Sequence, residues 1–407
     1  MALSEALTAN STVTTLGLRS NKVRINRTVA LSETLKTNLV PTTMALRRIL
    51  LGRNGAMALS EALKTNPTLT TLNLRSKLIG VNGAMALSEA LKTNTTLTSL
   101  DISGNLIRVN GAMALSEALK ANSTLTSLDL RSNLIEVNGA VALSEALKTN
   151  STLITLQLSD NSIKDDGTVA LSEALKINCT LATLELKSNL IGDNGAMALS
   201  EALKANSTLT TLDLRSNLIK VNGAMALSEA LKSNSTLTTL HLNDNSIKDG
   251  GAVALSEALK INCTMTTLDL WSNLSRNNGA MALSEARKTN STLTTLGLDS
   301  DLTGWNGGSD IGDYNEFFSP LFAASPEEYA AGTPVSFPDM NQVPSLHSFD
   351  LGARIPVLSN PIYKECTQNP DYQSFVGSSA HQRQMEIENQ LQMQGIENKL
   401  QMQQIEN

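Results

Sequence analysis

Residues 110–135 read NGAMALSEALKANSTLTSLDLRSNLI and consist of two parts with different periodicity. Its second part, LTSLDL, alternates apolar and polar residues as a short β-strand does. Its first part, GAMALSEAL, spaces its apolar residues as one face of a helix does. The two-part unit returns with a constant period of 28 up to about position 300, and with the worn copies near positions 13 and 41 it occurs eleven times. Eleven units in phase predict a solenoid of stacked strand–helix repeats.

The stretch NGAMALSEALKTN, residues 54–66, shows which side of the helix should face the strands. At about 100° per residue, a helical wheel separates an apolar half from a polar half. We expect the apolar half to pack against the strands, Asn54-Gly55 to open the helix, and Asn66 to follow it in the left-handed conformation. The apolar half consists of Ala56, Ala58, Leu59, Ala62 and Leu63, and the polar half of Met57, Ser60, Glu61, Lys64 and Thr65.

The spacing of the two layers predicts the architecture. Adjacent strands lie about 4.8 Å apart, whereas packed helices need about 10 Å. A parallel sheet backed by helices must therefore curve. We predict an α/β solenoid, a horseshoe of eleven 28-residue strand–helix units over residues 1–300, with the parallel sheet on the concave face and the helices on the convex face.

The strand part carries the pattern LxxLxLxxN, as in Leu97-Leu100-Ile102-Asn105 and again in Leu125-Leu128-Leu130-Asn133 of the next unit. Together with the GAMALSEAL helix, this pattern resembles the leucine-rich repeats of ribonuclease-inhibitor-like proteins, and most of all the version found in NOD-like receptors. The resemblance covers residues 1 to about 300 and implies the solenoid fold and a role in binding other proteins. Because the chain begins inside a repeat, we expect either a frayed first unit or the sensor portion of a larger NOD-like-receptor-type protein.

Composition excludes several classes of partner. The chain has 407 residues, 41% of them hydrophobic, and its formal net charge of −6 offers no basic surface for nucleic acid. No stretch reaches the roughly 18 apolar residues of a membrane span. Three cysteines do not make a disulfide framework, and the N-terminus carries no secretion signal. We therefore expect a cytoplasmic protein with no membrane span and no nucleic-acid partner.

A longer repeat is superimposed on the first. The stretch from Asn105 recurs from Asn189, and DNSIKDDG at Asp160 recurs as DNSIKDGG at Asp244. Both shifts equal three of the shorter periods, so a block of three units was duplicated. Residues that depart from the copied pattern are therefore more informative than residues that repeat it.

The concave face is the first candidate for a binding site. One column of its residues lies between the two closely spaced apolar residues of each strand, and the next column lies two positions on. Neighbouring acidic and basic columns favour a protein partner and fix its register. The alternative is that Asp129 and Arg131, and likewise Asp213 and Arg215, only pair with each other. The predicted partner-binding residues are Asp101, Asp129, Arg131, Glu185, Lys187, Asp213, Arg215, His241, Asp269 and Trp271.

Three of these residues, His241, Asp269 and Trp271, depart from the copied pattern in two adjacent units. An exposed tryptophan beside charged groups is typical of the residues that anchor protein interfaces. We therefore expect the strands around these three residues to be the centre of the binding site.

The convex face carries an apolar column. The helix position of Met57 is Met or Val in every unit, although it falls in the polar half of the wheel. We predict that each of these side chains packs sideways against the next helix. The alternative is a flexible Met-rich stripe that holds a second partner or another copy of the chain.

Nine asparagines near the helix ends form N-x-S/T sequons. We interpret them as structural, with Asn ending the helix and Ser or Thr starting the turn, rather than as glycan sites. Cys179 and Cys263 are copies of one position, too far apart for a disulfide, and we expect them to be half-buried. The sequon asparagines are Asn10, Asn94, Asn122, Asn150, Asn178, Asn206, Asn234, Asn262 and Asn290.

We expect no catalytic residue, no metal and no cofactor. The histidines, His241, His347 and His381, have no partner at motif spacing, and no P-loop, zinc spacing or nucleophile elbow occurs. We predict a non-enzymatic interaction scaffold or adaptor that binds proteins through the concave face. The alternative is a regulator of an enzyme, either an inhibitor or a GTPase activator of the Ran type. Self-association also stays open.

Composition changes near residue 300. One aromatic residue, Trp271, precedes that point, and eight of the ten prolines follow it. We predict a C-terminal cap over 301–324, a disordered Pro/Ser-rich linker over 325–380, and a Gln-rich tail, helical or disordered, over 381–407.

The linker contains two NPxY motifs in close succession. The pair resembles the cytoplasmic tail of integrin β chains, whose NPxY motifs dock phosphotyrosine-binding-type domains. The resemblance implies an adaptor whose repeats hold one partner while the linker recruits another. The residues concerned are Asn360, Pro361, Tyr363, Asn369, Pro370 and Tyr372.

Overall fold

A computed structural model describes residues 12–19, 32–36, 40–47, 51–273 and 277–298. All of them belong to the first of two units into which the chain divides, Met1–Ala323. The predicted cap over 301–324, the linker with its NPxY motifs and the Gln-rich tail lie outside the described residues.

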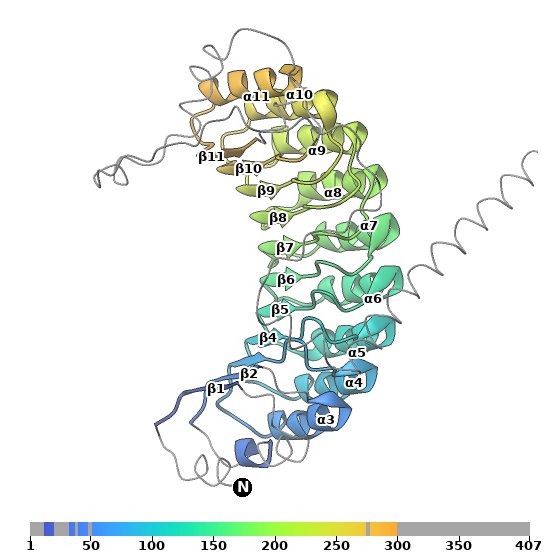
Figure 1. Ribbon diagram of the computed structural model, residues 1–407, viewed down its shortest axis with the longest axis vertical. Helices are drawn as coiled ribbons and strands as arrows, with labels where there is room; N and C mark the ends of the chain where they lie inside the picture. Colours follow the sequence, from blue (N-terminus) through green and yellow to red (C-terminus); the bar gives the residue numbers. More distant parts are fainter. Residues whose placement is uncertain (1–11, 20–31, 37–39, 48–50, 274–276, 299–407) are drawn as a thin grey trace, which may run out of the picture. The chain divides into compact units, whose positions relative to one another are not determined.

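Eleven parallel strands form one sheet in chain order, β1 to β11, so each strand pairs with the strand of the next repeat (Figure 1). The register is in phase throughout, because each residue lies beside its own copy in the next repeat, as Leu156 does beside Leu184. The strands are β1 Thr15–Arg19, β2 Thr43–Arg47, β3 Thr71–Asn73, β4 Ser99–Asp101, β5 Ser127–Asp129, β6 Thr155–Gln157, β7 Thr183–Glu185, β8 Thr211–Asp213, β9 Thr239–His241, β10 Thr267–Asp269 and β11 Thr295–Gly297.

The helices α3 to α11 stand side by side behind the sheet, one between each pair of successive strands from β2 to β11 (Figure 1). The predicted solenoid of repeated strand–helix units with one parallel sheet is therefore confirmed. We call its two sides the sheet face and the helix face. The helices are α3 Gly52–Leu63, α4 Gly80–Leu91, α5 Arg108–Ala121, α6 Glu136–Leu147, α7 Lys164–Leu175, α8 Asp193–Ala205, α9 Val221–Ser233, α10 Lys248–Leu259 and α11 Asn277–Thr289.

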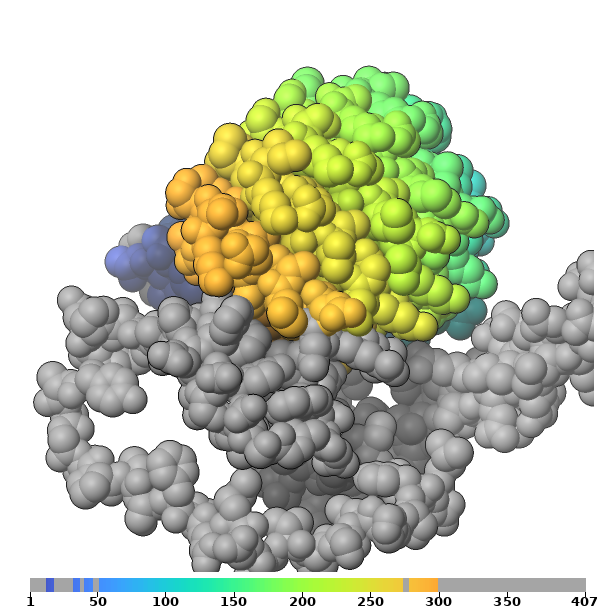
Figure 2. Space-filling view, turned by 90° about the horizontal axis from the view of Figure 1, so that it is seen from above, coloured from blue at the N-terminus to red at the C-terminus, as the bar shows by residue number. Residues whose placement is uncertain are grey.

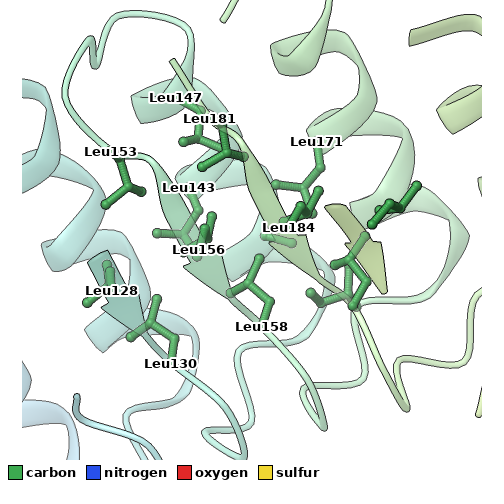
Figure 3. Close-up of a cluster of buried hydrophobic side chains, with 14 of the residues drawn as sticks. Leu128, Leu130, Leu143, Leu147, Leu153, Leu156, Leu158, Leu171, Leu181 and Leu184 are labelled. Carbon is green, nitrogen blue, oxygen red and sulfur yellow. The ribbon is translucent and has the colours of Figure 1, made fainter. Parts of the chain in front are cut away.

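The core is a continuous layer of leucines between the strands and the helices. Figure 3 shows it at β5 to β7, where Leu128, Leu156 and Leu184 of the strands meet Leu143 and other leucines of α6 and α7. These side chains are at most 1% exposed, and full burial of each contributes roughly 1.5–3 kcal/mol. Because every unit supplies the same residues, the core runs from repeat to repeat without a boundary.

Two expectations about the helix were wrong. Helix α3 begins at Gly52, ahead of Asn54-Gly55. Ser60 was placed on the polar half but is 1% exposed, because its hydroxyl donates to the Ala56 carbonyl at 2.7 Å within the helix. A small hydroxyl satisfied in this way can lie against the neighbouring helix.

The sequon asparagines are structural, but not in the predicted left-handed conformation. Asn122 is extended (φ −81°, ψ 129°). Its Oδ1 accepts from the backbone N–H groups of Thr124 and Leu125, at 3.1 and 2.8 Å, and its Nδ2 donates to the Leu91 carbonyl of the preceding repeat at 2.8 Å. The side chain therefore fastens two repeats together, and its buried nitrogen is already used; Asn10 lies outside the described residues.

The residue at or just before the start of each helix from α3 to α10 adopts one of two conformations. Glu136 at the start of α6 is left-handed, with φ 58°, and its N–H donates to the Asn161 carbonyl of the next repeat at 2.9 Å. Lys220, which occupies the same place in the second copy of the duplicated block, is extended, with φ −111°. Its N–H donates instead to Oδ1 of Asp193 in the preceding repeat, at 2.8 Å. An aspartate one repeat earlier thus changes the loop.

Replacing Glu136 with glycine should stabilise the protein by about 1 kcal/mol, because glycine occupies positive φ without the steric cost that other residues meet. The matched change Lys220→Gly should destabilise it by about 0.5–1 kcal/mol, since that position is already extended and glycine only adds unfolded-state entropy. Urea unfolding of the full chain measures both. Equal shifts for the two variants would contradict the assignment.

Candidate functional site

The ten predicted sheet-face residues lie together. The third residue of each strand forms one ladder across β4 to β10, from Asp101 to Asp269, and the residues two positions on follow the strand ends. The alternate residues are buried leucines or isoleucines. Strand alternation therefore brings all ten to the face opposite the helices.

Two of the acidic residues form ion pairs with the arginines two positions after them. Arg131 Nη2 donates to Oδ2 of Asp129 at 2.6 Å and its Nε to Oδ1 at 3.0 Å, and Arg215 holds Asp213 in the same way. Asp129 and Asp213 are only 6% and 2% exposed. The hydrogen bond that each arginine donates to its aspartate raises the pKa of that arginine above its ordinary value. The pairing predicted as the alternative is what the structure shows.

Two further carboxylates accept from neutral amides across the strands. Asn73 Nδ2 donates to Oδ2 of Asp101 at 2.6 Å, and Gln157 Nε2 donates to Oε1 of Glu185 at 2.7 Å. Lys187 is half-buried two positions after Glu185. These pairs join neighbouring repeats and leave each carboxylate its negative charge.

His241, Asp269 and Trp271 form one connected group on β9 and β10. Nδ1 of His241 lies 2.6 Å from Oδ2 of Asp269, and an ionised carboxylate can only accept, so Nδ1 carries the hydrogen. The indole Nε1–H of Trp271 donates to Oδ1 of Asn243, whose Nδ2 donates to the Asp269 carbonyl at 3.1 Å, with the amide oriented to satisfy both. Trp271 is 42% exposed.

Two contributors to this group were not predicted. Asn243 orients the indole, and it could have been found as the residue that replaces Ser159 of the other copy. Gly297 lies beside Asp269 on β11, and a Cβ there would be 2.6 Å from Oδ1 of Asp269. The glycine therefore leaves room for the carboxylate. Figure 2 views the molecule from the end that carries these last repeats, with α11 in orange.

The duplicated block supplies an internal comparison. The two copies, 105–188 and 189–272, differ at 15 of 84 positions, and among these are all three members of the group. Gln157, Glu185 and Lys187 stand where the later copy has His241, Asp269 and Trp271. The cross-strand hydrogen bond is retained in both copies, so the main chemical difference is that an indole replaces an ammonium group.

Lys77 interrupts a buried row of asparagines at the turn edge of the repeats. It stands where later repeats have asparagine, and it is 3% exposed. Burial lowers the pKa of its ammonium group, while the charge of Asp101 acts in the opposite direction. The folded protein therefore holds this proton less tightly than the unfolded chain does.

The free energy of unfolding, measured as a function of pH, should reveal the buried charge of Lys77. Between its lowered folded pKa and the ordinary value of 10.5, the unfolded chain binds more protons, so the stability of the wild type rises with pH in that window. Lys77→Met lacks the group, and its stability advantage at pH 7 should shrink as pH increases. Exposed Lys92→Met is the control and should show no such trend. A constant difference for Lys77→Met would contradict the burial effect.

The apolar column on the helix face is exposed. Met57, Met113 and Met225 are 44%, 50% and 49% exposed, and Val141 is 39% exposed. Sideways packing thus covers only part of each side chain, and the alternative of a stripe open to a partner or a second copy stays a prediction. Cys179 and Cys263 are exposed rather than half-buried, because they follow the buried helix-end asparagines outward.

The described residues contain no group of three or more histidine, cysteine, aspartate or glutamate side chains placed to hold a metal ion. In the same part of the chain no helix combines the length and the apolar character needed to span a membrane.

Comparison with known proteins agrees with the repeat geometry. A family profile described as "Leucine Rich repeat" matches seven segments, at 65–88, 93–116, 121–144, 149–172, 178–200, 205–228 and 233–256. The chain contains leucine-rich repeats. The match is to the repeat in general, and the strand and helix of each matched segment are those of one structural unit. No curated protein matches the chain in sequence.

Two solved structures resemble part of this leucine-rich-repeat protein. Actin-Binding Site 2 of leiomodin-1 is 26% identical, with a TM-score of 0.34, and the match covers 38% of this chain and 88% of that one. The C-terminal domain of tropomodulin from Caenorhabditis elegans is 15% identical, with a TM-score of 0.32, and the match covers 38% of this chain and 92% of that one.

Proposed function

We propose that this leucine-rich-repeat protein is a non-enzymatic scaffold that binds a protein partner through its sheet face. The observation that carries the proposal is the Trp271 group. A large aromatic side chain, 42% exposed, is held by Asn243 on a rigid sheet beside the His241–Asp269 pair. Preorganised aromatic side chains next to polar groups dominate the energetics of protein interfaces.

The other sheet-face pairs have a different role in this proposal. Asp129–Arg131 and Asp213–Arg215 are each satisfied within a single repeat, so replacing these contacts with contacts to a partner would gain little binding free energy. They supply a fixed electrostatic pattern that orients the partner. Because both arginines are engaged in these pairs, they do not support the GTPase-activating alternative. Among the described side chains of the sheet face, the exposed Arg75 is the arginine that this alternative could still use.

The resemblance to ribonuclease-inhibitor-like and NOD-like-receptor repeats supports the same role. We further propose that the NPxY motifs of the linker recruit a second, phosphotyrosine-binding-type partner, which makes the protein an adaptor. The cytoplasm is the proposed compartment, and two exposed free thiols, Cys179 and Cys263, support it, since oxidising compartments favour disulfides.

Affinity capture with the full chain, read by quantitative mass spectrometry, tests the proposal. Trp271→Ala should reduce capture of the main partner about tenfold or more, equivalent to ~1.4 kcal/mol. Lys187→Ala, the matched change in the earlier copy, should reduce it less than about twofold. A double Tyr363→Ala/Tyr372→Ala variant reports on the linker. Partners that resist Trp271→Ala but are lost with the tyrosine variant would overturn the sheet-face site.

A further inference from the structure

The site around Trp271 has one positive charge fewer than its internal copy. In the earlier copy, the site holds Glu185, Asp160 and the cation of Lys187. In the later copy, the corresponding site holds Asp269, Asp244 and the uncharged indole of Trp271. Both sites keep two carboxylates, so the Trp271 site lacks the one cation that the earlier site supplies from its own chain.

The two carboxylates belong to the same two neighbouring repeats as the indole and His241. Asp269 is two residues before Trp271 on the same strand end. Asp244 is in the neighbouring repeat, and its backbone N–H donates to the Trp271 carbonyl at 3.1 Å. The Asp244 carboxylate accepts from the Ser216 hydroxyl at 3.2 Å, a neutral donor that leaves its charge in place.

Arg215, the arginine that responds to the charge of Asp269, is already engaged. Its guanidinium makes a two-point contact with Asp213, two residues earlier in the same repeat. His241 donates one hydrogen bond to Asp269, while the carboxylate projects over Gly297, where a side chain would collide with it. Asp269 is 21% exposed as a side chain, and that open part is available to a donor from outside.

We propose that the Trp271 site binds an arginine side chain of the partner, with the guanidinium stacked on the indole and donating to Asp269. The arginine supplies from outside the cation that Lys187 supplies in the copied site. Arginine fits both surfaces, because its planar guanidinium stacks on aromatic faces and presents paired donors to a carboxylate. The inference rests on the proposed function, since it names the chemistry of the partner at the same site.

Trp271 itself reports binding. The chain contains two tryptophans, Trp271 and Trp305, so Trp305→Phe leaves Trp271 as the fluorophore. The probe is a capped peptide, Gly-Ser-Arg-Ser-Arg-Ser-Gly, compared with the same peptide carrying citrulline, which keeps the shape but loses the charge. Titrations at pH 8, where histidine side chains are ordinarily uncharged, should give a saturable change with arginine and at least about tenfold weaker binding with citrulline.

Three full-length variants complete the test, with folding checked by circular dichroism. Asp269→Asn, which keeps the shape, should weaken the arginine peptide about tenfold. Trp271→Lys supplies the internal cation and should abolish binding, measured by competition with a labelled peptide. Adding Lys187→Trp to Trp271→Lys should restore binding at the earlier copy, beside Glu185. Equal binding of both peptides, or unchanged binding by Asp269→Asn, would overturn the proposal.

The outcomes separate this inference from the scaffold role. If capture of a protein partner depends on Trp271 while the arginine and citrulline peptides bind alike, the scaffold role stands and the arginine assignment fails. If the arginine peptide binds as expected while every captured partner is indifferent to Trp271, the chemistry of the site stands and the proposed function fails.

Discussion

Replacing Asn161 with alanine is expected to destabilise the protein by about 3–5 kcal/mol. This asparagine is 0% exposed. Its Nδ2 donates to the carbonyls of Leu130 and Leu158, each at 2.9 Å, and its Oδ1 accepts from the N–H groups of Asn133 and Ile135. Alanine would leave the buried N–H groups of Asn133 and Ile135 unpaired, and each costs about 1–3 kcal/mol when no water replaces the partner. The two carbonyls would lose one of two donors, because Leu130 still accepts from Asn133 and Leu158 from Asn189.

The loss should be local as well as large. The stability of a solenoid is a sum over repeats and their interfaces, so the interface between the repeats of β5 and β6 should open first. Hydrogen exchange with mass spectrometry on the full chain locates that opening, and urea unfolding gives its size. Exposed Asn138 of the same repeat is the matched control, with an expected change below about 0.5 kcal/mol. A loss of stability under about 1 kcal/mol for Asn161→Ala would contradict the structural role of the buried asparagine row.

The buried asparagines that recur with the 28-residue period show how much of the fold the sequence determines. A period of 28 fixes which residues are neighbours, because each strand position pairs with its own copy in the next repeat. Leucines at LxxLxL and asparagine at the last position therefore predict the core and the register together. The same period predicts the sheet-face column from Asp101 to Asp269. All ten predicted residues lie on this column or two positions beyond it.

What could not be predicted depends on torsion angles and on the order of hydrogen bonds. Asparagine is common in the left-handed conformation after a helix, but Asn122 gains more from accepting two N–H groups and donating to the previous repeat. Likewise, Asp193 changes the conformation of Lys220 across a repeat boundary. A pattern within one unit contains no information about a bond between units.

The same limit applies to the binding face. The sequence identified Asp213 and Arg215 as neighbours, but only the rotamers decide that they pair within one strand, whereas Gln157 and Glu185 pair across two. Burial of Asp213 removes it from the surface available to a partner. The departures from the copied pattern were the better guide, because a change at one column of a duplicated block is seen against an otherwise unchanged background.

Two adjacent glycines in α10 should respond in opposite directions to replacement by larger residues. Alanine is favoured over glycine in a helix by about 1 kcal/mol, so propensity alone predicts stabilisation at both. A Cβ at Gly250 would meet Val221 Cγ1 at 3.0 Å, and Asp166 occupies the corresponding place in the earlier copy. Gly250→Ala should therefore stabilise by about 0.5–1 kcal/mol.

Gly251→Val should destabilise the protein by about 3 kcal/mol or more, which is the expected cost of overpacking with a branched side chain. A Cβ there would lie 2.4 Å from Ile247 Cγ2 and 2.8 Å from Ala224 Cβ of α9, so either Ile247 must leave its rotamer or the two helices must separate. The helices lie directly behind β9 and β10, so separation would also shift Trp271 against His241. Urea unfolding measures the stability, and Trp271 fluorescence in the Trp305→Phe background measures the shift. A Gly251→Val protein as stable as Gly250→Ala would show that the helices are not held at this distance by the missing side chain.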